Sequence, residues 1–169
     1  LWVNLPAKDK MTKPRYQGIQ NSSIPKVQLP KDAGSLRVIA GDYLEHKGPS
    51  RTFTPVNLWD TRLNAGKQAD FRIPSGQTTL VFVLSGNVQL GSGEKLGEAE
   101  LGVLDRTEEL FSLTALQDAK VLILTGEPIN EPVIGYGPFV MNTSAEIKQA
   151  FDDFNNGLMG QIGEIEGSK

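Results

Sequence analysis

The stretch Thr78-Thr79-Leu80-Val81-Phe82-Val83-Leu84-Ser85-Gly86-Asn87-Val88-Gln89-Leu90 decides the class of fold. Residues 78–84 are apolar, β-branched or aromatic throughout, which is typical of a strand. Ser85-Gly86-Asn87 is a turn signal, because glycine adopts the backbone angles that tight turns need. Residues 88–90 resume the strand pattern. The stretch therefore predicts a β-hairpin.

Further strands are predicted on both sides of this hairpin. In residues 69–73 the apolar Ala69, Phe71 and Ile73 alternate with the charged Asp70 and Arg72, as in a half-buried strand. Other segments of this kind are 36–40, 56–63, 99–104, 110–113 and 120–125. Since no helical pattern separates these strands, we expect an all-β fold, an antiparallel sandwich or jelly-roll barrel.

One helix is predicted near the C-terminal end. Thr143 and Glu146 have the spacing of a capping box, in which each side chain accepts from a free backbone N–H. An apolar stripe at helical spacing follows, formed by Ile147, Ala150, Phe151 and Phe154. Gly157 is a natural stop. The polar, glycine-rich tail 160–169 is expected to be poorly ordered.

The sequence divides into three parts. Residues 1–34 are predicted to form a short strand, Leu1 to Leu5, followed by a wrapping arm rich in proline and glycine. Residues 35–141 should form the barrel, and 142–169 the helix and tail. The chain starts at Leu1 and runs directly into apolar residues, so we expect it to be one half of a longer protein.

Composition excludes several classes of protein. The net charge is -3, whereas binding to nucleic acid needs concentrated Lys and Arg. The basic stretch from Lys8 to Arg15 is interpreted as a solvated arm. No apolar run is long enough to cross a bilayer. We expect a cytoplasmic protein that binds neither nucleic acid nor membranes directly.

Catalytic chemistry has few candidate residues. The chain has no cysteine and one histidine, His46, which lies in a loop-like stretch. A single imidazole cannot build a metal site or serve as base for several serines. The glycines at 91, 93 and 97 lack the Lys-Ser/Thr ending of a phosphate-binding loop. We therefore expect no catalytic, cofactor-binding or metal-binding residue in this chain.

Several motifs resemble those of a known family. The stretch Ile73-Pro74-Ser75-Gly76, with the hairpin after it, resembles the first conserved strand pair of a cupin barrel. Residues 1–6 and 14–17 resemble the interdomain passage of pirins. Gly126-Glu127-Pro128-Ile129-Asn130-Glu131-Pro132-Val133 and Gly137-Pro138-Phe139-Val140-Met141-Asn142-Thr143 resemble the pirin C-terminal signature. The chain is thus identified as the C-terminal cupin half of a pirin-like protein.

The resemblance implies a protein with two cupin barrels. Iron or another divalent metal would be held by three His and one Glu in the N-terminal barrel, which is absent from this sequence. In the present barrel the positions matching the cupin ligands hold Arg72, Pro74 and Thr78. None of these side chains is a plausible ligand for a redox metal.

Pirins are associated either with quercetinase activity or with transcriptional co-regulation through protein partners. The leading hypothesis is therefore a metal-free domain that supports the N-terminal cupin domain and possible protein partners. The alternative is a structural contribution to a quercetinase-like dioxygenase whose active site lies in the absent half. A third interpretation is a complete single-barrel binder of a sugar or small ligand.

Two sets of residues follow from these hypotheses. Residues expected at an interdomain or partner contact are Leu1, Trp2, Val3, Tyr16, Ile147, Phe151 and Phe154. Aromatic residues that could line a ligand cavity, although core packing is favoured for them, are Trp59, Phe71, Phe82 and Phe111.

Overall fold

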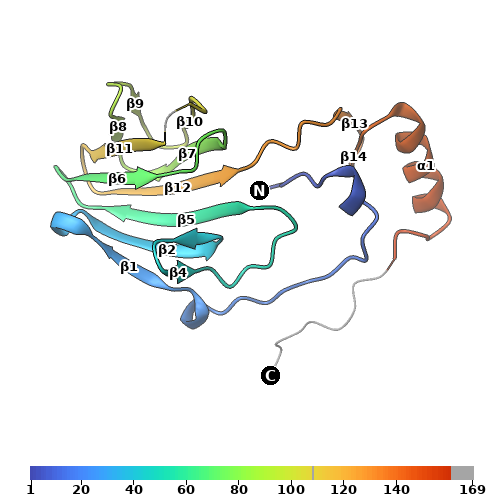
Figure 1. Cartoon of the computed structure of the whole chain (residues 1–169), viewed down its shortest axis with the longest axis horizontal. Coiled ribbons are helices and arrows are strands. Elements are labelled where there is room, and N and C mark those ends of the chain that lie inside the picture. Colours follow the sequence, from blue (N-terminus) through green and yellow to red (C-terminus); the bar gives the residue numbers. More distant parts are fainter. Residues whose placement is uncertain (108, 161–169) are drawn as a thin grey trace. The chain divides into compact units, whose positions relative to one another are not determined.

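The computed structural model describes residues 1–107 and 109–160 (Figure 1). The predicted disorder of the tail falls almost entirely outside this range. In the described part of the chain no helix is long and apolar enough to cross a membrane. The chain forms two compact units: unit 1 comprises Leu1–Gly18 with Ile129–Lys169, and unit 2 comprises Ile19–Pro128.

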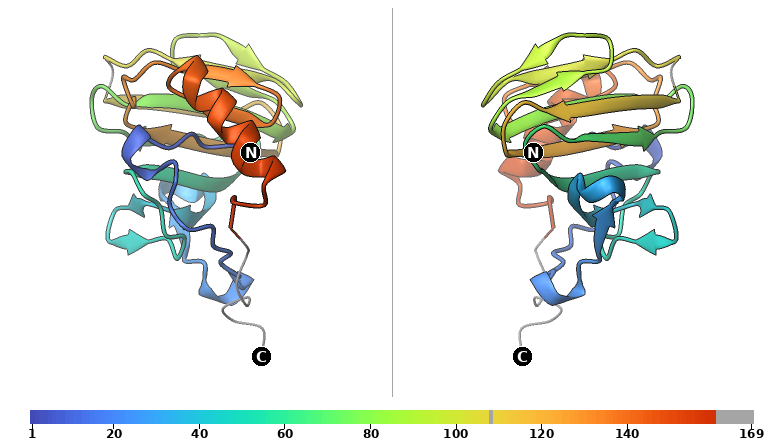
Figure 2. Two further views of the ribbon diagram at one scale, coloured as in Figure 1. Left: turned by 90° about the vertical axis from the view of Figure 1, so that its right-hand side faces the viewer. Right: turned by 90° about the vertical axis from the view of Figure 1, so that its left-hand side faces the viewer.

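Unit 2 contains two antiparallel sheets, which can be followed in Figures 1 and 2. The six-stranded sheet has the order β1 (Lys26–Leu29), β2 (Gly34–Ala40), β5 (Val56–Leu63), β12 (Ala119–Gly126), β7 (Thr78–Ser85) and β10 (Leu101–Leu104). The four-stranded sheet has the order β6 (Gln68–Arg72), β11 (Leu110–Ala115), β8 (Val88–Leu90) and β9 (Lys95–Leu96). A small hairpin joins β3 (Asp42–Tyr43) to β4 (His46–Lys47). Short 3-10 turns span Asn21–Ser23 and Pro30–Asp32.

The core of unit 2 lies between the inner faces of these sheets. Alternate residues of β6 and β12 are buried, as the period of a strand requires. Trp59 and Phe71 are the largest fully buried side chains, and their rings stack at 6.4 Å. The prediction of an all-β, antiparallel sandwich or barrel is confirmed.

Unit 1 contains the hairpin of β13 (Ile134–Tyr136) and β14 (Phe139–Met141), the helix α1 (Ser144–Asn155) and a 3-10 turn at Ala7–Asp9. The predicted capping box is present. Glu146 N–H donates to Thr143 Oγ1 (3.2 Å), and Thr143 N–H donates to Glu146 Oε2 (2.7 Å). Phe139 of β14 contacts Phe151 of α1 edge to face, with ring centroids 4.9 Å apart.

Residues 1–5 form no strand within the described chain, so the interdomain strand expected there stays a prediction. A strand needs a neighbour to complete its ladder of hydrogen bonds, and these residues pair with none of the described strands. The predicted arm also differs from the structure, because β1 pairs with β2 from Lys26↔Arg37 to Leu29↔Gly34. Residues 19–34 are thereby part of the barrel unit, and 129–141 are part of unit 1.

Candidate functional site

Two of the three expected ligand positions, Arg72 and Pro74, do not face the barrel interior, and Thr78 is half-buried. Arg72 is exposed and pairs with Glu109 at 3.8 Å, and Pro74 is also exposed. Phe71 and Ile73, one residue before each, are buried, so strand alternation puts them on the inner face. The positions assigned as cupin ligands therefore include two outward-facing residues. Phe71 and Ile73, the inward residues beside them, are apolar and offer a metal no ligand atoms.

The rest of the described chain does not fit a redox metal either. No group of three or more His, Cys, Asp or Glu residues in the described ranges could hold an ion. His46 begins β4 and lies 3.5 Å from Glu45, on the surface hairpin. Mononuclear iron sites need several imidazole and carboxylate ligands that converge on one point. The described residues provide no such set.

Buried polar side chains in the barrel serve the fold. The Thr125 hydroxyl accepts from Asn57 Nδ2 at 2.8 Å and donates to Gln77 Oε1 at 2.7 Å. The amide oxygen of Asn57, Oδ1, accepts from the backbone N–H of Asp42. This chain of hydrogen bonds connects β12, β5 and the entry to β7. Because its members satisfy one another, it is a structural network.

A cavity of about 780 Å³ opens in unit 2. β11 pairs with β6 from Leu110 to Thr114, but with β8 only from Leu113 onward. One edge of β11 is therefore free at Leu110 and Phe111. At this free edge, residues on both faces of β11 line the cavity. This is the size of pocket that ordinarily holds a small organic molecule.

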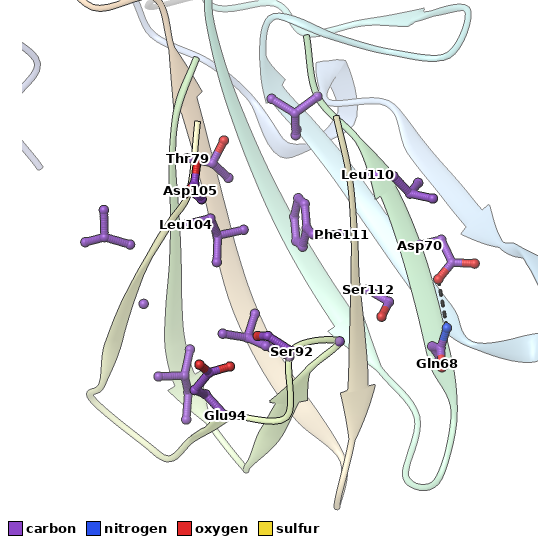
Figure 3. A pocket seen from close by; sticks show the side chains of 16 residues that line it. Gln68, Asp70, Thr79, Ser92, Glu94, Leu104, Asp105, Leu110, Phe111 and Ser112 are labelled. Atoms are coloured by element: carbon purple, nitrogen blue, oxygen red, sulfur yellow. Dashed lines mark hydrogen bonds between the residues drawn. The ribbon is translucent and has the colours of Figure 1, made fainter. Parts of the chain in front are cut away.

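The inner wall of the cavity is apolar. It is formed by Ile73, Leu90, Leu96, Leu104 and Phe111. Figure 3 shows Leu104 and Phe111 reaching into this space, and Gln68 and Asp70 on the other side of β11, joined by a hydrogen bond of 2.9 Å. Thr79 contributes a hydroxyl to the wall.

Carboxylates supply the charge around the cavity. Asp70, Glu94 and Asp105 line it, whereas its described lining residues include no Lys, Arg or His. Hydrogen bonds from the Ser92 side chain and from its own backbone N–H lower the pKa of Glu94. The Thr107 backbone N–H and hydroxyl lower the pKa of Asp105. Both groups are therefore ionised at neutral pH.

The four aromatic residues considered for a cavity have different places. Trp59 and Phe71 are core residues. Phe111 stacks on Phe71 at 5.3 Å and also lines the cavity. Phe82 lies between the buried Val81 and Val83, so its side chain points to the opposite, outer face of β7. Only Phe111 is placed to contact a ligand in this cavity.

The predicted contact residues lie in unit 1, and most are accessible. Trp2 is 66% exposed and Phe154 62% exposed. Leu1, Val3 and Tyr16 are also exposed, and Phe151 is half-buried against Tyr136 and Phe139. Ile147 is the exception, since it is 7% exposed. A contact role remains a prediction for the accessible residues.

The structure adds exposed apolar residues that the sequence did not single out. In unit 1 these are Met11, Val133, Tyr136 and Leu158. They lie in short segments without helical or strand periodicity, apart from Tyr136 at the end of β13. Together with Leu1, Trp2, Val3, Tyr16 and Phe154 they form what we call the apolar residues of unit 1.

The fold and its motifs have known counterparts. Residues 58–160 match the family described as the pirin C-terminal cupin domain. This chain belongs to the pirin family. It is 50% identical over 157 residues to the Pseudomonas aeruginosa protein named "Putative quercetin 2,3-dioxygenase PA2418", covering 93% of this chain and 54% of the relative. Pirin of Homo sapiens is 37% identical over 166 residues, with 95% and 56% covered.

A solved structure is similar to this chain over nearly its whole length. The crystal structure of a quercetin 2,3-dioxygenase from Acinetobacter baumannii aligns with a TM-score of 0.90 at 48% identity. The alignment covers 96% of this chain and 56% of that chain. This pirin-family chain therefore spans about half the length of these relatives. The predicted family and the cupin half to which the chain corresponds are both confirmed.

Proposed function

We propose that this pirin-family chain is a metal-free contact domain. It packs through the apolar residues of unit 1 against the other half of a two-barrel protein and supports that half's metal-binding barrel. The observation that carries the proposal is the exposure of Trp2, Tyr136 and Phe154 on unit 1. Aromatic residues of this kind dominate the binding energy of protein interfaces.

Two further observations support a contact role. Phe71 of β6 and Ile73 just after it face the core and are buried, so at these positions the barrel interior carries packing side chains and no metal ligands. The relatives extend over about as many residues again as this chain covers, which is the length of a second domain. A second domain would bury the apolar surface that unit 1 leaves open.

Reassembly of the two halves tests the proposal. The 169-residue chain and a separately produced N-terminal half should associate in analytical ultracentrifugation. Replacing Trp2→Ala or Phe154→Ala should weaken association by about tenfold or more, since buried interface aromatics each contribute more than about 1.4 kcal/mol. Leu116→Ala, an exposed apolar residue of unit 2, is the matched control. Absence of association, or equal association of all variants, would contradict the proposal.

A second candidate function concerns the whole protein. The names of the Pseudomonas and Acinetobacter relatives favour a quercetinase-like dioxygenase whose active site lies outside this chain. Oxygen uptake by the iron-loaded full-length protein with quercetin tests it. Iron-dependent turnover supports the enzyme. Capture of a protein partner without turnover supports a co-regulator instead.

A further inference from the structure

The cavity beside the free edge of β11 has features beyond those of a gap in packing. Its walls come from both sheets of unit 2, with Leu104 from β10, Phe111 from β11 and Leu90 from β8. Phe111 is held in place because its ring stacks on the fully buried Phe71. A rigid aromatic wall of this kind favours a flat apolar group in the cavity.

A buried polar group also faces this space. Thr79 is 4% exposed and lines the cavity. Asp105, next to Leu104 at the end of β10, lines the same cavity. A ligand with a donor group could therefore hydrogen-bond both to a hydroxyl and to a carboxylate.

The charge of the cavity selects among ligands. The carboxylates of Asp70, Glu94 and Asp105 are not balanced by a basic side chain among the described lining residues. An anionic ligand would be repelled, and a cation would be attracted. A cationic group near the Phe111 ring would gain a cation–π contact as well.

We propose that this cavity binds a small aromatic amine, with its ring against Phe111 and Leu104 and its ammonium group toward the carboxylate of Asp105, which lies beside Thr79 (Figure 3). Glu94, at the other end of the cavity, adds to the negative potential that attracts the cation. The site belongs to unit 2 alone and does not depend on the apolar residues of unit 1. Its test therefore gives an answer whether or not the contact role is correct.

Three related probes test the chemistry of the site on the 169-residue chain. Tryptamine carries a cationic amine, 3-methylindole is neutral, and indole-3-acetate is an anion of similar size. Calorimetry at neutral pH and low salt should show binding in the order tryptamine, 3-methylindole, indole-3-acetate. Failure of tryptamine to bind, or equal binding of the anion, would overturn the proposal.

Variants then locate the site. The double variant Glu94→Gln with Asp105→Asn should weaken tryptamine binding by roughly threefold to tenfold, and leave 3-methylindole unchanged, because only charge is removed. Leu104→Trp should abolish binding of both by filling the cavity. Asp152→Asn, an exposed carboxylate of α1, is the matched control. Unchanged affinity in the double variant would overturn the proposal.

If Leu104→Trp fails to fold, backbone amide chemical shifts of the unaltered chain still locate the site. In the unaltered chain, tryptamine should shift the backbone amides of Leu104, Phe111 and Ser112. The amides of α1 should stay in place. Shifts confined to α1 or to residues 1–18 would mean that the amine binds elsewhere, and that the cavity is not its site.

Discussion

Two buried threonines show how single residues decide whether a polar group helps this fold. The Thr125 hydroxyl has two side-chain partners, Asn57 and Gln77. The Thr61 hydroxyl is equally buried but has no hydrogen-bond partner among the described residues. A satisfied buried hydroxyl stabilises the folded state, whereas an unsatisfied one destabilises it.

The same substitution should therefore have different effects at these two sites. Thr125→Val leaves the polar atoms of Asn57 and Gln77 without their partner and should lower the free energy of unfolding by about 1–3 kcal/mol. Thr61→Val should leave it unchanged or raise it by up to about 1 kcal/mol. Urea denaturation measures both. Equal losses at the two positions would contradict this account of the barrel interior.

Gly86 is the second residue whose role the structure makes specific. It has a positive φ of 85°, and a Cβ there would overlap the carbonyl oxygen of Asp118. Gly76 has the same φ of 85°, but a Cβ there would meet no atom within 4 Å. The two glycines share their backbone strain and differ in the space around them.

Alanine at these positions separates the two effects. Gly76→Ala should cost about 1–2 kcal/mol of unfolding free energy, from the left-handed backbone alone. Gly86→Ala should cost about 1–3 kcal/mol more, because the turn between β7 and β8 must move away from Asp118. The comparison is made by denaturant unfolding. A similar loss for both variants would show that the close approach is unimportant.

At the scale of elements, local signals predicted the structure well. The strand at 56–63 was predicted with its observed bounds, and α1 begins after the predicted cap. The turn between β7 and β8 lies at the predicted residues, but the predicted hairpin is wrong, because β7 belongs to the six-stranded sheet and β8 to the four-stranded sheet. In each case the information lies within a few neighbouring residues. A turn glycine or a capping box acts on its own segment.

Features that depend on distant pairing were not predictable in this way. β1 is a strand because β2 runs beside it, and residues 1–5 are not because no described strand does. The cavity depends on where β8 stops pairing with β11, at Leu113. Along β6 a shift of one residue exchanges inward and outward side chains, as strand alternation dictates.

The capping box gives a prediction for α1. Thr143→Ala removes the acceptor for the Glu146 N–H and should reduce the local stability of the helix by about 1 kcal/mol. Thr143→Ser keeps the oxygen and should behave as the unaltered chain. Hydrogen exchange of the amides in the first turn of α1 measures the difference. Equal protection in both variants would show that the cap does not hold this helix.

At the scale of the whole molecule, the two units differ in what their side chains expose. Unit 2 has a packed interior and a cavity with an aromatic wall and acidic lining. Unit 1 carries exposed aromatic residues around the β13–β14 hairpin and α1. We expect unit 1 to contact the other half of a pirin-type protein. We expect unit 2 to be a supporting barrel that holds no metal of its own.

The central claim is that the described residues of this barrel bring no set of metal ligands together. Metal analysis of the 169-residue chain, after incubation with Fe²⁺ or Ni²⁺ and removal of unbound ions, tests it most directly. The account predicts that the chain retains no stoichiometric metal. One tightly bound ion per chain, coordinated by side chains of residues 72–113, would contradict it.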